Sequence, residues 1–96
     1  MSAYVVLDVE ILDPQAYEDY RALAPASIAA FGGSYLARGG RTEVLEGTHT
    51  PNRIVILRFD TVERVKQWLE SAQYRPAKEI RHRAARTSMI VIEGLP

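Results

Sequence analysis

The sequence contains no cysteine, only two histidines and no excess of charge of either sign. Without cysteine there is no disulfide framework, no thiolate metal site and no cysteine nucleophile. The histidines, His49 and His82, lie far apart in the chain, so we do not expect a His-rich metal site. Twelve Lys and Arg balance twelve Asp and Glu, whereas a nucleic-acid-binding domain usually carries a basic excess. We therefore expect no metal and no nucleic-acid partner.

Long hydrophobic runs are also missing. No apolar stretch approaches the roughly 20 residues that cross a bilayer, so we expect no membrane partner. The N-terminal run has no basic n-region and includes Asp8 and Glu10, which is unlike a signal peptide. We expect a cytoplasmic protein. A chain of 96 residues without repeat or linker predicts a single domain over residues 1–96 with a modest core.

The apolar pattern predicts the element order β-α-β-β-α-β, with a short extra helix before the last strand. β-branched and alternating segments indicate strands, and apolar residues recurring every three or four positions indicate helices. The expected strands are residues 3–11, 34–38 with 41–46 as a bent pair, 53–59 and 88–94, and the expected helices are residues 14–31, 60–70 and about 75–86. This order is typical of an α+β, ferredoxin-like, four-stranded antiparallel sheet with helices on one face.

Local signals refine the helices. Asp13 is a good N-cap residue for the first helix. Pro25 lies inside the same helix and removes a backbone donor, so we expect a kink or break near Ala24. Asp60 and Glu63 have the spacing of a capping box, which predicts Asp60 as the cap of the second helix.

Both faces of the expected sheet are apolar. The first and third strands should be neighbours, and helices should cover the face that carries Val5, Leu7, Val9, Val55, Leu57 and Phe59. The opposite face is too apolar to remain in water; it carries Tyr4, Val6, Asp8, Ile54, Ile56 and Arg58. We therefore expect a homodimer in which a second sheet covers this face, with Asp8 and Arg58 as a cross-strand ion pair.

Several segments resemble, in order and spacing, the family known as domain of unknown function 1330 (DUF1330). They are DPQAYEDY, FGGSYLARGG, EVLEG, NRIVILRF, SAQYRPAKEIR and IVIEG, and the most specific is GG-x-Y/F-L-x-R-GG at residues 32–40. The resemblance implies a dimeric α/β-barrel, in which two ferredoxin-like sheets pack face to face. The wider superfamily includes small cofactor-independent monooxygenases with a pocket between sheet and helices. No activity of the family itself carries over, and we expect no bound cofactor.

Two arginines at family-like positions are candidates for binding an anion. Arg38 follows a strand and precedes Gly39-Gly40, a turn or bulge whose positive φ glycine supplies without strain. Its guanidinium could hold a carboxylate in bidentate fashion, and the alternative is a surface ion pair with Glu43 or Glu46. Arg81 is the second candidate.

The remaining candidates are four aromatic residues and two proton-transfer groups. Tyr17, Tyr20, Trp68 and Tyr74 could line a pocket, although such rings more often belong to a core or interface. Glu43 and His82 could move a proton, although His82 lies between basic residues and exposure is its alternative. We expect a protein that binds, and could transform without a cofactor, a small anionic or aromatic metabolite. The alternative is a non-catalytic binding or assembly module.

Overall fold

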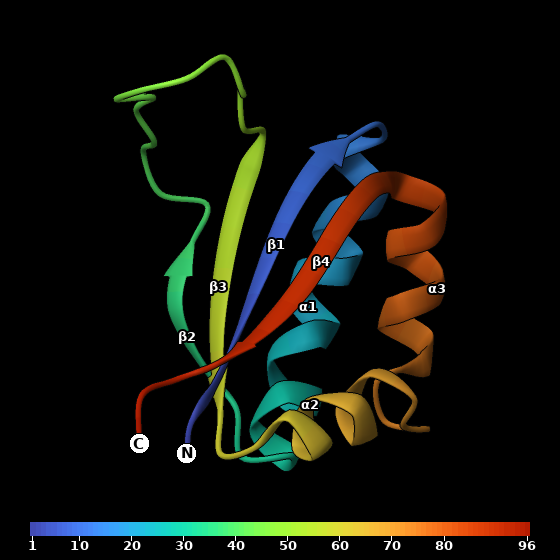
Figure 1. The fold of residues 1–96 in the computed structure, drawn as a ribbon. Helices are drawn as coiled ribbons and strands as arrows, with labels where there is room; N and C mark the ends of the chain where they lie inside the picture. Colours follow the sequence, from blue (N-terminus) through green and yellow to red (C-terminus); the bar gives the residue numbers. More distant parts are fainter.

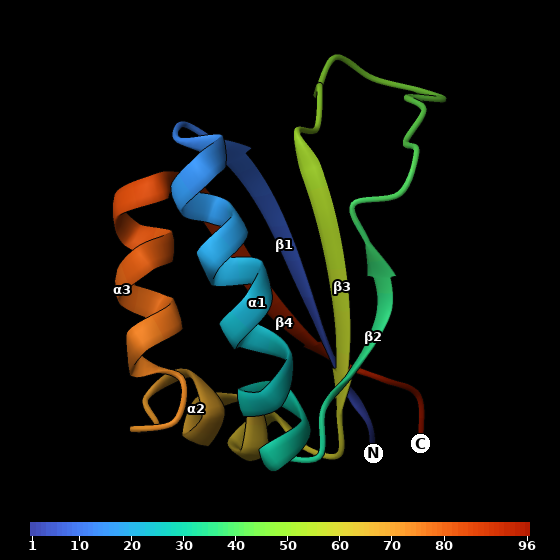
Figure 2. The same ribbon diagram turned by 180° about the vertical axis from the view of Figure 1, so that it is seen from behind.

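The computed structural model describes residues 1–96 and contains a four-stranded antiparallel sheet with three helices on one side (Figures 1 and 2). In chain order the elements are β1 (Ala3–Ile11), α1 (Pro14–Ala30), β2 (Ser34–Arg38), β3 (Arg53–Phe59), α2 (Val62–Leu69), α3 (Arg75–Ala84) and β4 (Ala85–Glu93). The strand order is β2-β3-β1-β4. The predicted ferredoxin-like α+β fold, with β1 and β3 at the centre, is confirmed.

The core lies between the sheet and the helices. Val5 pairs with Leu57 and Leu7 with Val55 across the centre of the sheet, and all four side chains are buried. The alternation of apolar residues therefore places both strands' apolar sets on the face that α1, α2 and α3 cover, as predicted. The helices are visible in front of this face in Figure 2. None of them is long and apolar enough to cross a membrane.

The other face of the sheet carries no helix (Figure 1). Ile90 and Ile92 on β4 point to it and are 63% and 59% exposed, and Leu36 on β2 is 55% exposed. An apolar surface of this kind is uncommon on a monomer. Met89 and Val91 alternate with these isoleucines; they lie beside Leu7 and Val5 on the covered side and are less exposed.

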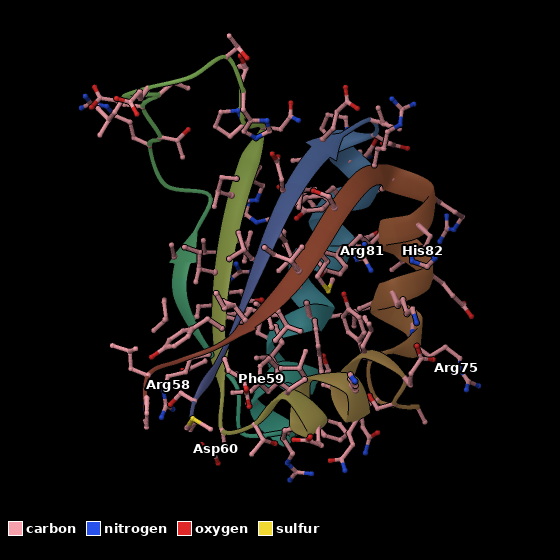
Figure 3. All side chains as sticks on the ribbon, in the orientation of Figure 1. Arg58, Phe59, Asp60, Arg75, Arg81 and His82 are labelled. Atoms are coloured by element: carbon pink, nitrogen blue, oxygen red, sulfur yellow. The ribbon has the colours of Figure 1, made fainter.

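The predicted ion pair between Asp8 and Arg58 is wrong. The register pairs Asp8 with Ile54 and Arg58 with Tyr4, which places the two charges toward opposite ends of the β1–β3 pair. Arg58 Nη1 instead lies 3.8 Å from Asp60 Oδ1 at the end of β3 (Figure 3). The carboxylate of Asp8 accepts a hydrogen bond from a backbone N–H of the loop before β3.

Helix α1 continues through its proline. Asp13 caps the helix as predicted, and its Oδ1 accepts from Ala16 N at 3.1 Å. We expected a kink or a break near Ala24; the break is wrong, because a single helix runs from Pro14 to Ala30 with Pro25 inside it. The cap of α2 also differs from the prediction: Thr61, one residue after the predicted cap, accepts from a backbone N–H of the first turn.

The predicted strand at residues 41–46 is wrong. The chain leaves the sheet after Arg38 and returns at Arg53, and residues 41–50 are all exposed. Both views show this loop projecting beyond the sheet (Figures 1 and 2). A strand needs a neighbouring strand to pair its backbone groups, and the chain turns away from β3 at Gly39, where φ is +67°.

Candidate functional site

A narrow pocket lies between α1 and the β2–β3 side of the sheet. Apolar side chains of β1, β3 and α1 form its floor, and its polar or aromatic lining consists of Tyr17, Tyr20, Arg21, Tyr35, Arg38 and Arg53. The free volume inside is about 10 Å³, which is roughly the room needed for one water molecule. The pocket is therefore almost filled by its own side chains.

Three guanidinium groups surround this pocket, and they come from three different elements. Arg21 lies on α1, Arg38 ends β2 and Arg53 begins β3. Arg21 forms an exposed ion pair with Glu18 at 3.0 Å, whereas Arg38 and Arg53 have no carboxylate within ion-pairing distance. The Nε atoms of Arg21 and Arg53 are buried and have no hydrogen-bond partner. Buried unpaired donors beside uncompensated positive charge favour an anionic partner.

Arg38 bridges β2 and α1 at the mouth of the pocket. Its Nη2 donates to the backbone carbonyl of Arg21 at 2.9 Å, and its guanidinium carbon lies 4.6 Å from the centroid of the Tyr35 ring. The hydrogen bond and the cation–π contact hold the guanidinium in one place. Burial raises the pKa of Tyr35, and the nearby Arg38 opposes this shift.

Arg53 is held against the turn that follows β2. The positive φ of Gly39 favours glycine, and a Cβ atom there would also displace the guanidinium of Arg53. A Cβ at Gly40 would meet nothing, and its φ is not positive. The other face of Arg53 lies toward Tyr17, whose ring centroid is 5.8 Å away. Burial raises the pKa of Tyr17, and Arg53 partly offsets this.

A buried hydrogen-bond network adjoins the pocket. Arg81 on α3 is 6% exposed and has no carboxylate partner; its Nε donates to Tyr74 Oη at 3.2 Å. Tyr74 Oη lies 2.8 Å from Tyr20 Oη. The network therefore runs from α3 to α1. Figure 3 shows Arg81 between these two helices. The pKa of Tyr20 is raised well above its ordinary value, chiefly by burial and to a smaller extent by the neighbouring Tyr74.

Residues 2–95 match the family model for the domain of unknown function DUF1330. The chain belongs to this family. No functionally curated protein matches the DUF1330 chain by sequence.

Solved structures share the fold of this DUF1330 chain at low sequence identity. A protein of unknown function from Rhodopseudomonas palustris is 17% identical with a TM-score of 0.79, covering 99% of this chain and 83% of that one. SnoaB, a cofactor-independent oxygenase from Streptomyces nogalater, is 12% identical with a TM-score of 0.68, covering 99% and 94%. A Nitrosomonas europaea protein named for the antibiotic biosynthesis monooxygenases is 13% identical with a TM-score of 0.57, covering 97% and 90%. These similarities show the fold alone.

The structure brings only some of the site residues predicted for this DUF1330 chain together. Arg38, Tyr17 and Tyr20 line the pocket, and Arg81 and Tyr74 form the network behind Tyr20. The other three candidates lie elsewhere, as described next.

Trp68, Glu43 and His82 do not reach the pocket. Trp68 is a fully buried core residue whose Nε1 donates to Ser27 Oγ at 3.2 Å. Glu43 lies in the exposed loop and pairs with Arg41. His82 is exposed on α3 (Figure 3). Trp68 is packed in the core, and Glu43 and His82 are exposed, so none of the three lines the pocket.

Three residues that line the pocket are not among the site residues predicted from the sequence. Arg21 lies four residues after Tyr17, a spacing that puts both on one face of a helix. Tyr35 pairs with Leu57 across β2 and β3, which places it on the covered face. Arg53 lies in the segment NRIVILRF, which resembles the family, and the sequence predicts it only as the first residue of a strand. Helical spacing and strand alternation were the signals that could have found the first two.

Proposed function

We propose that the pocket beneath α1 binds a small organic anion with an aromatic or apolar body. The observation that supports this is the group of three guanidiniums around an aromatic pocket, of which Arg38 and Arg53 have no carboxylate partner. Arginine binds carboxylates through paired N–H donors. The tyrosine rings and the apolar floor supply the surface that small-molecule sites use to hold a ligand body.

The ligand must be small, and it must enter at the mouth formed by Arg38. The free volume of about 10 Å³ means that a ligand enters only by displacing side chains. Tyr35 is half-buried on β2, an edge strand, so its ring can move without opening the core, while Arg38 stays at the mouth. A carboxylate with a single ring keeps the displacement small and is therefore the test ligand.

Binding is the part of this function that the geometry supports best. The lining groups that can exchange a proton are tyrosines, and burial raises the pKa of Tyr17, Tyr20 and Tyr35. These hydroxyls therefore act as neutral hydrogen-bond donors near neutral pH. The cofactor-independent oxygenase SnoaB shares the fold, so oxygen consumption without an added cofactor is the assay for turnover. The alternative is a binding module without turnover. The proposal of an anion site is the same in both cases.

We also propose that the protein is a homodimer. The uncovered face of the sheet, with Ile90, Ile92 and Leu36 more than half exposed, would be covered by the same face of a second copy. Burial of this apolar area favours association. Light scattering coupled to size exclusion should give twice the mass of one chain, and Ile90→Lys should reduce it toward the mass of one chain.

Calorimetry and thermal unfolding with benzoate test the anion site. Benzamide is the control ligand, since it has nearly the same shape without the charge. Benzoate at 100 times its Kd should stabilise the protein by about 2.7 kcal/mol. The Tm should therefore rise by roughly 11–22 °C, given about 4–8 °C per kcal/mol for a domain of this size.

Matched arginine variants locate the site. Arg53→Gln should weaken benzoate binding by about tenfold or more, since it removes a charge-assisted hydrogen-bond donor. Arg83→Gln, which alters an exposed arginine of α3 that forms no ion pair, should bind as the wild type does. Equal shifts with benzoate and benzamide, or equal affinities of the two variants, would contradict the proposal.

A further inference from the structure

Pro25 leaves one backbone carbonyl of α1 without its helical donor. In an α-helix the N–H of residue i donates to the carbonyl of residue i−4. Proline has no N–H, and its ring also crowds that carbonyl and turns it away from the helix axis. The carbonyl concerned is that of Arg21, one turn before Pro25 in an otherwise unbroken helix.

Arg38 occupies the position of the missing donor. Its Nη2 donates to the Arg21 carbonyl at 2.9 Å from the end of β2, 17 residues along the chain. The guanidinium uses one edge for this bond and rests on Tyr35. Its other N–H donors form no hydrogen bond to a side chain or ion pair, and Arg38 lines the pocket mouth.

We propose that Pro25 is a positioning residue of the anion site: the carbonyl that it frees holds Arg38 across the pocket mouth with donors left for a carboxylate. This inference rests on the proposed function of the pocket. Its physical basis is preorganisation, because a long side chain that is already ordered costs less entropy when the ligand binds. The helix-breaking residue therefore serves the site rather than interrupting the helix.

The variant Pro25→Ala separates this role from a merely structural one. Alanine restores the N–H and is the more favourable residue in a helix interior, so the protein should unfold at higher urea concentration. Benzoate should nevertheless bind about 3- to 10-fold more weakly, since Arg38 must then be ordered on binding. Greater stability with lower affinity is the expected signature.

Two controls make the experiment decisive. Pro14→Ala alters the proline at the first position of the same helix, where no hydrogen bond is lost, and benzoate affinity should not change. In an Arg38→Gln background, Pro25→Ala should have no further effect on affinity. Unchanged affinity of Pro25→Ala, or the same loss with and without Arg38, would overturn the inference.

A ligand-free measurement distinguishes its failure from that of the proposed function. Urea unfolding should show that Arg38→Gln destabilises the wild type more than it destabilises Pro25→Ala, because the Arg21 carbonyl needs Arg38 only when residue 25 is proline. If this coupling is present and benzoate does not bind, the anion site is wrong, but the role of Pro25 in holding Arg38 is supported. If benzoate binds at the arginines and the coupling is absent, the role of Pro25 is wrong.

Discussion

Replacement of Tyr74 by Phe removes one hydroxyl from the centre of the network of Tyr20, Tyr74 and Arg81 and keeps the buried ring. The hydroxyl accepts from Arg81 Nε at 3.2 Å and lies 2.8 Å from Tyr20 Oη. Arg81 is 6% exposed and has no carboxylate, so water cannot easily replace the lost acceptor. A buried donor without a partner costs about 1–3 kcal/mol, and more when it is charged. We therefore expect Tyr74→Phe to lower the free energy of unfolding by about 2–4 kcal/mol.

Urea denaturation followed by far-UV circular dichroism measures this loss. Tyr35→Phe is the matched control, because the hydroxyl of Tyr35 forms no hydrogen bond and its removal should change the free energy of unfolding by less than about 0.5 kcal/mol. In an Arg81→Met background the charged donor is gone, so Tyr74→Phe should cost at least about 1 kcal/mol less. A loss below about 0.5 kcal/mol, or equal losses with and without Arg81, would refute the reasoning.

Two further predictions concern pH and the turn after β2. Burial holds the pKa of Tyr20 above its ordinary value, so the folded protein retains a proton that the unfolded chain releases above about pH 10. The stability that this proton contributes is complete below about pH 10 and falls at higher pH by about 1.4 kcal/mol per pH unit. Urea unfolding between about pH 9 and 11.5 should show this fall. In Tyr20→Phe the slope of the free energy of unfolding against pH should be smaller by the contribution of one titrating group. Gly39→Ala should cost at least about 1–2 kcal/mol, because φ is +67° and the new Cβ would displace Arg53, and it should also weaken benzoate binding. Gly40→Ala should do neither, since a Cβ there meets nothing; similar results for the two glycine variants would show that Arg53 does not depend on the turn.

Much of the fold could be read from periodicity, whereas the site could be read only in part. Tyr17 and Tyr20 recur at helical spacing with the core residues of α1, and they line the pocket that the structure shows. The sequence predicts both Arg38 and Arg81 as anion-binding residues. Arg38 lies at the pocket mouth, whereas Arg81 lies inside a buried hydrogen-bond network. Residue type and local spacing do not reveal which element will pack over a charged group, so these two environments could not be distinguished.

Periodicity alone predicts the sheet and the face that the helices cover. Strand alternation has a period of two, so a shift of the register by one residue would put the apolar sets of β1 and β3 on opposite faces. Features that depend on groups distant in the chain could be known only from the folded structure. Residues 41–46 have strand-like composition but no neighbouring strand. The Arg21 carbonyl, which Pro25 leaves without its helical donor, accepts a hydrogen bond from Arg38 of another element. Local propensity is set by adjacent residues, but the partners of a backbone carbonyl are set by the whole fold.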